Sequence, residues 1–189
     1  MDIRSLARED IEGLYHAHMT NDFPAAERKP LEVLFSLYDR GLYPCYGLFD
    51  GEELVAYAFF VMSEGGSMPL LDYFAVVDGR RSGGYGSIFL EKLRETSKGY
   101  QGILLEVERV SAAQNEEERQ IRERRIAFYL RAGCRMTDIH PTVLDVRFDV
   151  MYLACNGDRD DEALKGALDG IYHTLFEDRY DRAVRYDEG

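Results

Sequence analysis

Apolar residues recur every three or four positions in several parts of the chain, which is the pattern of helices with one buried face. A first helix is predicted from the stripe Ile11, Leu14, Tyr15 and His18, and a second between Pro30 and Gly41. Two more are predicted over about residues 84–97 and 117–132, the latter ended by a glycine. A last apolar stripe, over about residues 163–175, follows the acids at positions 160–162 and predicts an amphipathic C-terminal helix.

Elsewhere the hydrophobic pattern is that of strands. Strands are predicted over residues 3–6, 45–49, 54–62, 70–77, 103–110, 135–140 and 148–154, with Pro141 separating the last two. Asp50-Gly51 is a strong signal for a hairpin turn between the second and third of these strands. Hairpins followed by strand–helix–strand crossovers predict one α/β domain, with a mixed sheet covered by helices on both faces.

Composition narrows the class of protein. The chain has 189 residues, 46% of them hydrophobic, which is enough to build a core. No apolar run approaches the ~20 residues that a membrane helix needs, and the N-terminus has no apolar signal segment. The three cysteines form no CxxC motif, so we expect reduced thiols and a cytoplasmic setting. A net charge of −12 argues against binding to nucleic acid, and the four histidines have no metal-ligand spacing.

The most informative segment runs from Leu70 to Leu90. Here an apolar strand leads into a turn in which two arginines are followed by the glycines at positions 83, 84 and 86, and an amphipathic helix follows directly. The first amides of a helix have no intrahelical acceptor, and glycines let an anion approach them, so the segment predicts a phosphate site. The Walker lysine and the third glycine of the dinucleotide motif are both missing, and a glycine turn that serves packing alone is the alternative.

At these residues the sequence resembles the GNAT N-acetyltransferase family, whose signature Arg/Gln-x-x-Gly-x-Gly/Ala fits Arg81 to Gly86. The resemblance implies a mostly antiparallel sheet flanked by helices, with acetyl-CoA as co-substrate and no metal. It implies that the turn binds the coenzyme pyrophosphate and that the preceding strand binds the pantetheine arm. The implied coenzyme contacts are Phe74, Ala75, Val76, Arg81, Ser82, Gly83, Gly84, Tyr85, Gly86 and Ser87.

The resemblance extends to a Leu-Glu-Val strand and a Phe-Tyr-x-x-x-Gly segment. It implies Glu106 as the base that takes a proton from the attacking amine, and Tyr129 as the acid that protonates the leaving thiolate. Asp72 on the motif strand is the alternative base. A salt-bridged strand carboxylate and a packed core tyrosine are the structural alternatives for Glu106 and Tyr129.

The implied activity is transfer of an acetyl group to a primary amine of a small molecule or peptide, with a homodimer as one possible assembly. A non-catalytic acyl-CoA-binding module and a transferase for longer acyl chains remain alternatives. The acids of the segments expected to form the acceptor groove could receive a cationic amine or lie in solvent: Asp22, Glu27, Asp145 and Asp149. We expect residues 1–156 to form the acetyltransferase domain and residues 157–189 to add a C-terminal helix and charged tail packed on it.

Overall fold

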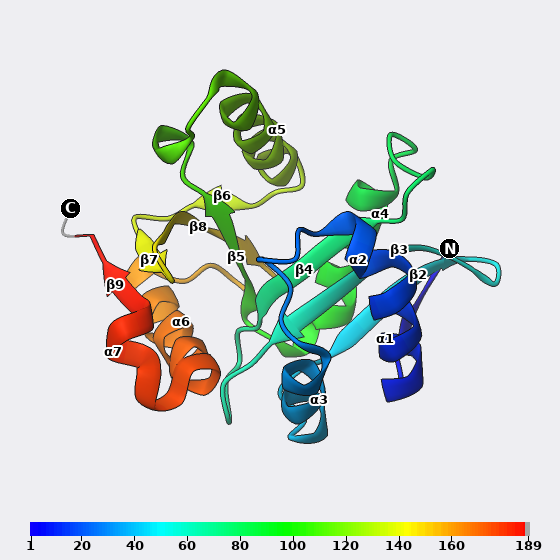
Figure 1. The fold of residues 1–189 in the computed structure, drawn as a ribbon, viewed down its shortest axis with the longest axis horizontal. Coiled ribbons are helices and arrows are strands. Elements are labelled where there is room, and N and C mark those ends of the chain that lie inside the picture. Colours follow the sequence, from blue (N-terminus) through cyan, green and yellow to red (C-terminus); the bar gives the residue numbers. More distant parts are fainter. Residues whose placement is uncertain (188–189) are drawn as a thin grey trace. The chain divides into compact units, whose positions relative to one another are not determined.

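The computed structural model describes residues 1–187, which form nine strands and seven α-helices joined by short 3-10 and π segments (Figure 1). Chain contacts divide it into two compact units. The first unit comprises Met1–Val61 and Leu71–Leu93, and the second comprises Met62–Leu70 and Arg94–Gly189. The predicted boundary after residue 156 stays a prediction.

Four strands build the sheet of the first unit, in the order β1 (Asp2–Ser5), β2 (Cys45–Asp50), β3 (Glu53–Val61) and β4 (Leu70–Val76). The pairs β1–β2 and β2–β3 are antiparallel. The predicted hairpin is confirmed, with Gly51 in its turn at φ +65°. Strand β3 is buried at every position from residue 55 to residue 61, so it forms the centre of the core of this unit.

The helices of this unit are α1 (Arg8–Leu14), α2 (Thr20–Asp22), α3 (Leu31–Asp39) and α4 (Tyr85–Thr96). A π-helical segment, η1 (Tyr15–Met19), follows α1 directly. The predicted stripe of the first helix is therefore partly wrong, because the wider π turn shifts the register and buries Met19 in place of His18. In Figure 1, α1 and α3 lie in front of the strands and α4 passes behind them.

The main strands of the second unit are β5 (Gly102–Glu108) and β8 (Val146–Ala154), paired antiparallel over seven residues. The prediction of one strand over residues 135–140 is wrong. Only β6 (Arg135–Met136) pairs with β8 there, and Pro141, expected to separate two strands, begins β7 (Pro141–Val143). A proline can occupy the first position of a strand. Strand β9 (Val184–Tyr186), which pairs with β7, was not predicted from the sequence.

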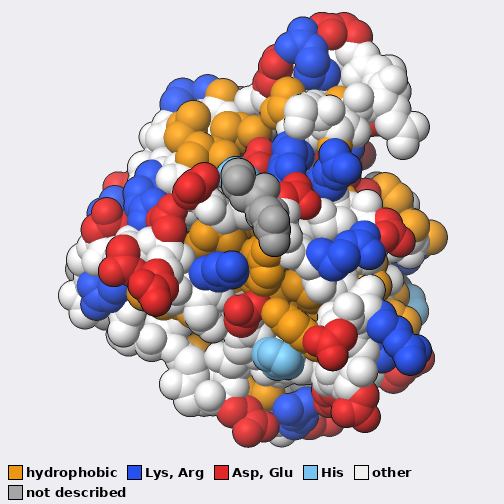
Figure 2. All heavy atoms as spheres, turned by 90° about the vertical axis from the view of Figure 1, so that its left-hand side faces the viewer, with side chains coloured by type: hydrophobic (Ala, Val, Ile, Leu, Met, Phe, Trp, Pro, Cys, Tyr) orange, Lys and Arg blue, Asp and Glu red, His pale blue; other side chains and the backbone are white. Residues whose placement is uncertain are grey.

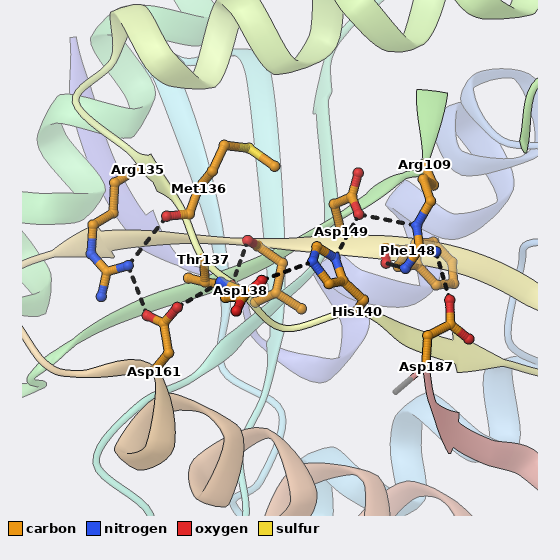
Figure 3. Close-up of polar contacts among 11 residues, drawn as sticks. Arg109, Arg135, Met136, Thr137, Asp138, His140, Phe148, Asp149, Asp161 and Asp187 are labelled. Carbon is orange, nitrogen blue, oxygen red and sulfur yellow. Dashed lines mark hydrogen bonds and ion pairs between the residues drawn. The ribbon is translucent and has the colours of Figure 1, made fainter. Parts of the chain in front are cut away.

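Three α-helices belong mainly to the second unit: α5 (Glu116–Arg131), α6 (Asp161–Phe176) and α7 (Tyr180–Ala183). The side chain of Asn115 caps α5, and Gly133 follows its end at φ +90°, as expected. Asp160 caps α6, which buries Leu164, Leu168, Ile171 and Tyr172. In Figure 3 the strands of this unit run between α5 above and α6 below, so the C-terminal helix is part of its layered core.

None of the helices in the described residues combines the length and hydropathy that a membrane crossing requires. Over the face drawn in Figure 2, Asp and Glu side chains lie beside Lys and Arg side chains. Arg185 and Asp145 form an exposed ion pair, with 2.9 Å between Nη2 and Oδ1. The strands are mostly antiparallel and helices flank them, which confirms the predicted α/β class.

Candidate functional site

The turn between β4 and α4 has the local geometry that its glycines predicted. The Arg80 amide donates to the Val77 carbonyl at 3.0 Å, and the chain then passes through Ser82 and Gly84, both at positive φ (+67° and +79°). A Cβ at Gly83 would lie 2.7 Å from the Tyr85 ring, whereas a Cβ at Gly84 would meet open space. Glycine is therefore favoured at both positions, for contact at the first and for conformation at the second.

The N-terminus of α4 can receive an anion. Its first amide with a backbone acceptor is that of Ile88, which donates to the Gly84 carbonyl at 3.2 Å. The amides of Tyr85, Gly86 and Ser87 precede this bond, at the positive end of the helix dipole. The open space at Gly84 lies at the start of this helix turn. The amides of Tyr85, Gly86 and Ser87 there are therefore suited to bind a phosphate oxygen.

Both arginines of the turn are held by carboxylates. Arg80 pairs with Glu53, and the Nη2 of Arg81 donates to the Oδ1 of Asp22 at 2.8 Å. Asp22 also accepts a hydrogen bond from the Tyr57 hydroxyl at 2.8 Å, and burial, followed by this bond, raises the pKa of that phenol. The Asp22 side chain is 3% exposed and that of Arg81 is 59% exposed. Asp22, predicted to contact an amine or solvent, is instead a buried anchor for Arg81.

Replacing Asp22 with alanine is expected to lower the free energy of unfolding by about 1–3 kcal/mol, because Tyr57 and Arg81 lose a buried acceptor. Asp39, the exposed partner of Arg8, provides a matched control, since its side chain is 58% exposed. Its replacement by alanine is expected to cost about 0–1 kcal/mol. Urea denaturation of both variants measures the two losses, and equal losses would contradict the anchoring role of Asp22.

The strand before the turn carries the expected pantetheine contacts and the alternative base. Phe74, Ala75 and Val76 are partly exposed, and the Phe74 ring stacks on Phe89 with 5.7 Å between the ring centroids. Asp72 accepts hydrogen bonds from the Lys29 ammonium at 2.6 Å and from the Tyr43 hydroxyl at 2.5 Å. Both carboxylate oxygens of Asp72 are therefore engaged by groups of the chain itself. These contacts favour a structural role for Asp72.

The segment before α3 is attached to the same strand by Tyr73. The Tyr73 hydroxyl donates to the Glu27 carbonyl and accepts from the Lys29 amide, each at 2.8 Å. The Tyr15 hydroxyl donates to the Lys29 carbonyl at 3.1 Å. Together with the Lys29–Asp72 ion pair, these bonds fix residues 27–29 against β4. Sequence reasoning placed this segment in the acceptor groove but did not find its anchors.

Glu106 lies on β5 in the second unit, opposite Val150 of β8. Tyr172 of α6 donates its hydroxyl hydrogen bond to the Oε1 of Glu106. The Tyr172 side chain is buried, and this burial, followed by the nearby Glu106 charge, raises the pKa of the phenol. Sequence reasoning missed Tyr172, whose only signal was its place in the apolar stripe of the C-terminal helix.

Tyr129 lies in the last part of α5 and is 8% exposed. Burial raises the pKa of its phenol to about 12, with the Arg125 charge acting in the opposite direction. At neutral pH the phenol is therefore protonated and can donate a proton or a hydrogen bond. Cys134, which follows the same helix, is also buried, and burial raises its pKa to about 12, which does not favour a thiolate nucleophile.

The acids near the β7–β8 hairpin are engaged with basic side chains (Figure 3). Asp149 accepts from the Nε of Arg109 at 3.1 Å and lies 2.9 Å from the Nδ1 of His140. Arg109 also donates to Asp187 at 2.6 Å, which attaches the C-terminal strand to this cluster. Within residues 1–187, no three His, Cys, Asp or Glu side chains are grouped so that they could hold a metal ion.

The structure is similar to solved structures of GNAT acetyltransferases. One from Bacteroides thetaiotaomicron, assigned to that family, matches with a TM-score of 0.72 and 24% identity, over 92% of this chain and 97% of its own. The ribosomal-protein-S18-alanine N-acetyltransferase of Escherichia coli matches at 0.59 and 21%, over 85% and 97%. The spermidine N-acetyltransferase of Vibrio cholerae, crystallised with CoA and spermine, matches at 0.59 and 11%, over 81% and 94%.

These likenesses show that the chain has the GNAT N-acetyltransferase fold, as the resemblance in sequence implied. No protein-family model matches the sequence, and no curated protein is similar enough to match it.

Proposed function

We propose that this protein is an acetyl-CoA-dependent N-acetyltransferase that acts on a primary amine. The observation that carries the proposal is the turn between β4 and α4. At the start of α4, three amides come before the first amide that donates to a backbone carbonyl, and a Cβ at the neighbouring Gly84 would meet open space. The GNAT fold supports the same function, since a solved structure with this fold, the Vibrio cholerae enzyme, contains CoA and spermine.

In this proposal the coenzyme is held by the first unit of the chain. The amides from Gly83 to Ser87 bind the pyrophosphate, and the exposed guanidinium of Arg81 adds positive charge while Asp22 fixes its position. Backbone groups of Phe74, Ala75 and Val76 bind the pantetheine arm. Acetyl-CoA supplies the thioester that is transferred.

The chemical step needs a proton acceptor and a proton donor. The amine nitrogen attacks the thioester carbonyl carbon, and the carbon–sulfur bond breaks without a covalent enzyme intermediate. Glu106 takes the proton that the amine loses, directly or through water, and Tyr129 gives its phenol proton to the departing thiolate. Solvent then reprotonates Tyr129. Proximity supplies much of the acceleration, and proton transfer contributes about 10²–10⁴-fold.

Two measurements on the purified protein test the proposal. Isothermal titration with acetyl-CoA measures binding, and a thiol-reactive dye measures release of CoA in the presence of polyamines, aminoglycosides and N-terminal peptides. Binding together with amine-dependent thiol release is expected. Binding without release for any amine would favour a non-catalytic acyl-CoA-binding module, and tighter binding of longer acyl-CoAs would favour a different acyl donor. No binding would contradict the proposal.

A further inference from the structure

The C-terminal helix α6 contacts the sheet of the second unit through one polar group, the hydroxyl of Tyr172. The helix is anchored by the Asp160 cap and by a stripe of buried side chains. Tyr172 belongs to this stripe and is 1% exposed, and its hydroxyl reaches the Oε1 of Glu106 on β5. A buried phenol needs a hydrogen-bond partner, and here that partner is the proposed base.

Glu106 has apolar and charged neighbours on its face of the sheet. Residues directly opposite in an antiparallel pair share a face, as do alternate residues of one strand. Leu104 and Val150, both fully buried, are therefore its neighbours along β5 and across on β8. Glu108, which pairs with Arg122, is its neighbour on the other side along β5. In such surroundings a carboxylate is costly to ionise unless a donor faces it, and Tyr172 is such a donor.

A second carboxylate holds the rest of the C-terminal segment. The Oδ1 of Asp169, one turn before Tyr172 in α6, accepts from the hydroxyls of Tyr180 at 2.7 Å and Tyr186 at 2.8 Å. These bonds join α6 to α7 and β9. The titratable groups that act on Tyr172 are thus Glu106, Asp169 and Tyr186, and the charge of Glu106 in turn acts on Tyr186.

We infer that Tyr172 is a positioning residue for Glu106, so that the C-terminal helix takes part in the reaction centre rather than only covering the sheet. This inference rests on the proposed function. The phenol fixes the Oε1 of Glu106 and stabilises the ionised carboxylate, which keeps the base deprotonated near neutral pH. Without the hydroxyl, the carboxylate holds its proton to higher pH and its Oε1 loses the hydrogen bond from α6.

Replacing Tyr172 with phenylalanine keeps the ring and removes the hydroxyl. We expect kcat to fall about tenfold with an unchanged Kd for acetyl-CoA. The acidic limb of the pH profile of kcat/KM should move upward by about one unit, since a hydrogen bond to a charged group changes an ionisation equilibrium by about tenfold or more. Tyr180→Phe is the matched control, because it removes a phenol hydroxyl from Asp169 and not from Glu106. It should leave the profile unchanged.

A double-mutant comparison separates positioning from structure. In the Glu106→Gln background, Tyr172→Phe should cause no further loss of kcat. An equal loss in both backgrounds, or an unshifted pH profile, would overturn the inference.

An NMR titration of ¹³C-labelled glutamate carboxyls decides the same question without turnover. The midpoint of Glu106 should rise in Tyr172→Phe and stay constant in Tyr180→Phe, and a constant midpoint in both would overturn the inference. If no amine is acetylated, the proposed function fails, while this titration still tests the contact between Tyr172 and Glu106.

Discussion

Replacing Gly84 with valine is expected to abolish acetyl-CoA binding while the protein stays folded. Gly84 has a φ of +79°, a conformation that costs an L-residue with a Cβ about 1–2 kcal/mol. A valine side chain would also fill the open space at the start of α4, where we propose that the amides bind the phosphate. Isothermal titration should show affinity reduced by about 100-fold or more, the cost of losing one or two charge-assisted hydrogen bonds.

The same loop contains a matched control. Gly79 has a φ of +80°, and a Cβ there would also meet open space, but it lies in the turn before the motif. Gly79→Val and Gly84→Val should therefore lower the melting temperature by similar amounts, and only Gly84→Val should lose the coenzyme. Wild-type affinity in Gly84→Val would show that this turn does not hold a phosphate. Equal loss of affinity in both variants would show that general distortion of the loop, and not the helix amides, governs binding.

The architecture could be predicted because its signals are local. The hairpin at Gly51, the glycine after α5 and the stripe of α6 each depend on residues a few positions apart. The errors arise where the backbone departs from regular periods. The π segment after α1 moves burial from His18 to Met19, and β7 and β9 are three-residue strands, which are too short for a hydrophobic pattern.

The proposed site likewise has parts that depend on neighbouring residues and parts that depend on residues far apart in the sequence. The strand–turn–helix arrangement of the glycine turn could be predicted because these parts are adjacent in sequence, and its binding of a phosphate stays a prediction. Two contacts made by charged residues of the proposed site were not predicted. Arg81 and Asp22 are 59 residues apart in sequence, and Tyr172 and Glu106 are 66 residues apart. Such pairs cannot be predicted from a single sequence. The packing of α2 and α6 brings these hydrogen-bond partners together, and their separation along the chain does not indicate it.

Replacing Tyr129 with phenylalanine is expected to lower kcat by about 100-fold or more, because the leaving thiolate loses its proton donor. The affinity for acetyl-CoA should change little, since the ring that packs in α5 is retained. Burial raises the pKa of this phenol to about 12, so it stays protonated through pH 10. The pH profile of kcat for the wild-type protein should therefore show no decrease caused by ionisation of Tyr129 below pH 10. Stopped-flow detection of free thiol under single-turnover conditions measures the chemical step directly.

Tyr152 separates this chemical role from the loss of any buried phenol. Its ring is 1% exposed, it belongs to β8 of the same unit, and its hydroxyl donates to the Gln101 carbonyl at 2.9 Å. Tyr152→Phe should lower the free energy of unfolding by about 0.5–1.5 kcal/mol and leave kcat unchanged. If Tyr129→Phe likewise affects stability alone, Tyr129 is a core residue and the thiolate takes its proton from water. If only Tyr129→Phe slows thiol release, the phenol is the acid, because each variant removes one phenol hydroxyl from a buried tyrosine of the same unit.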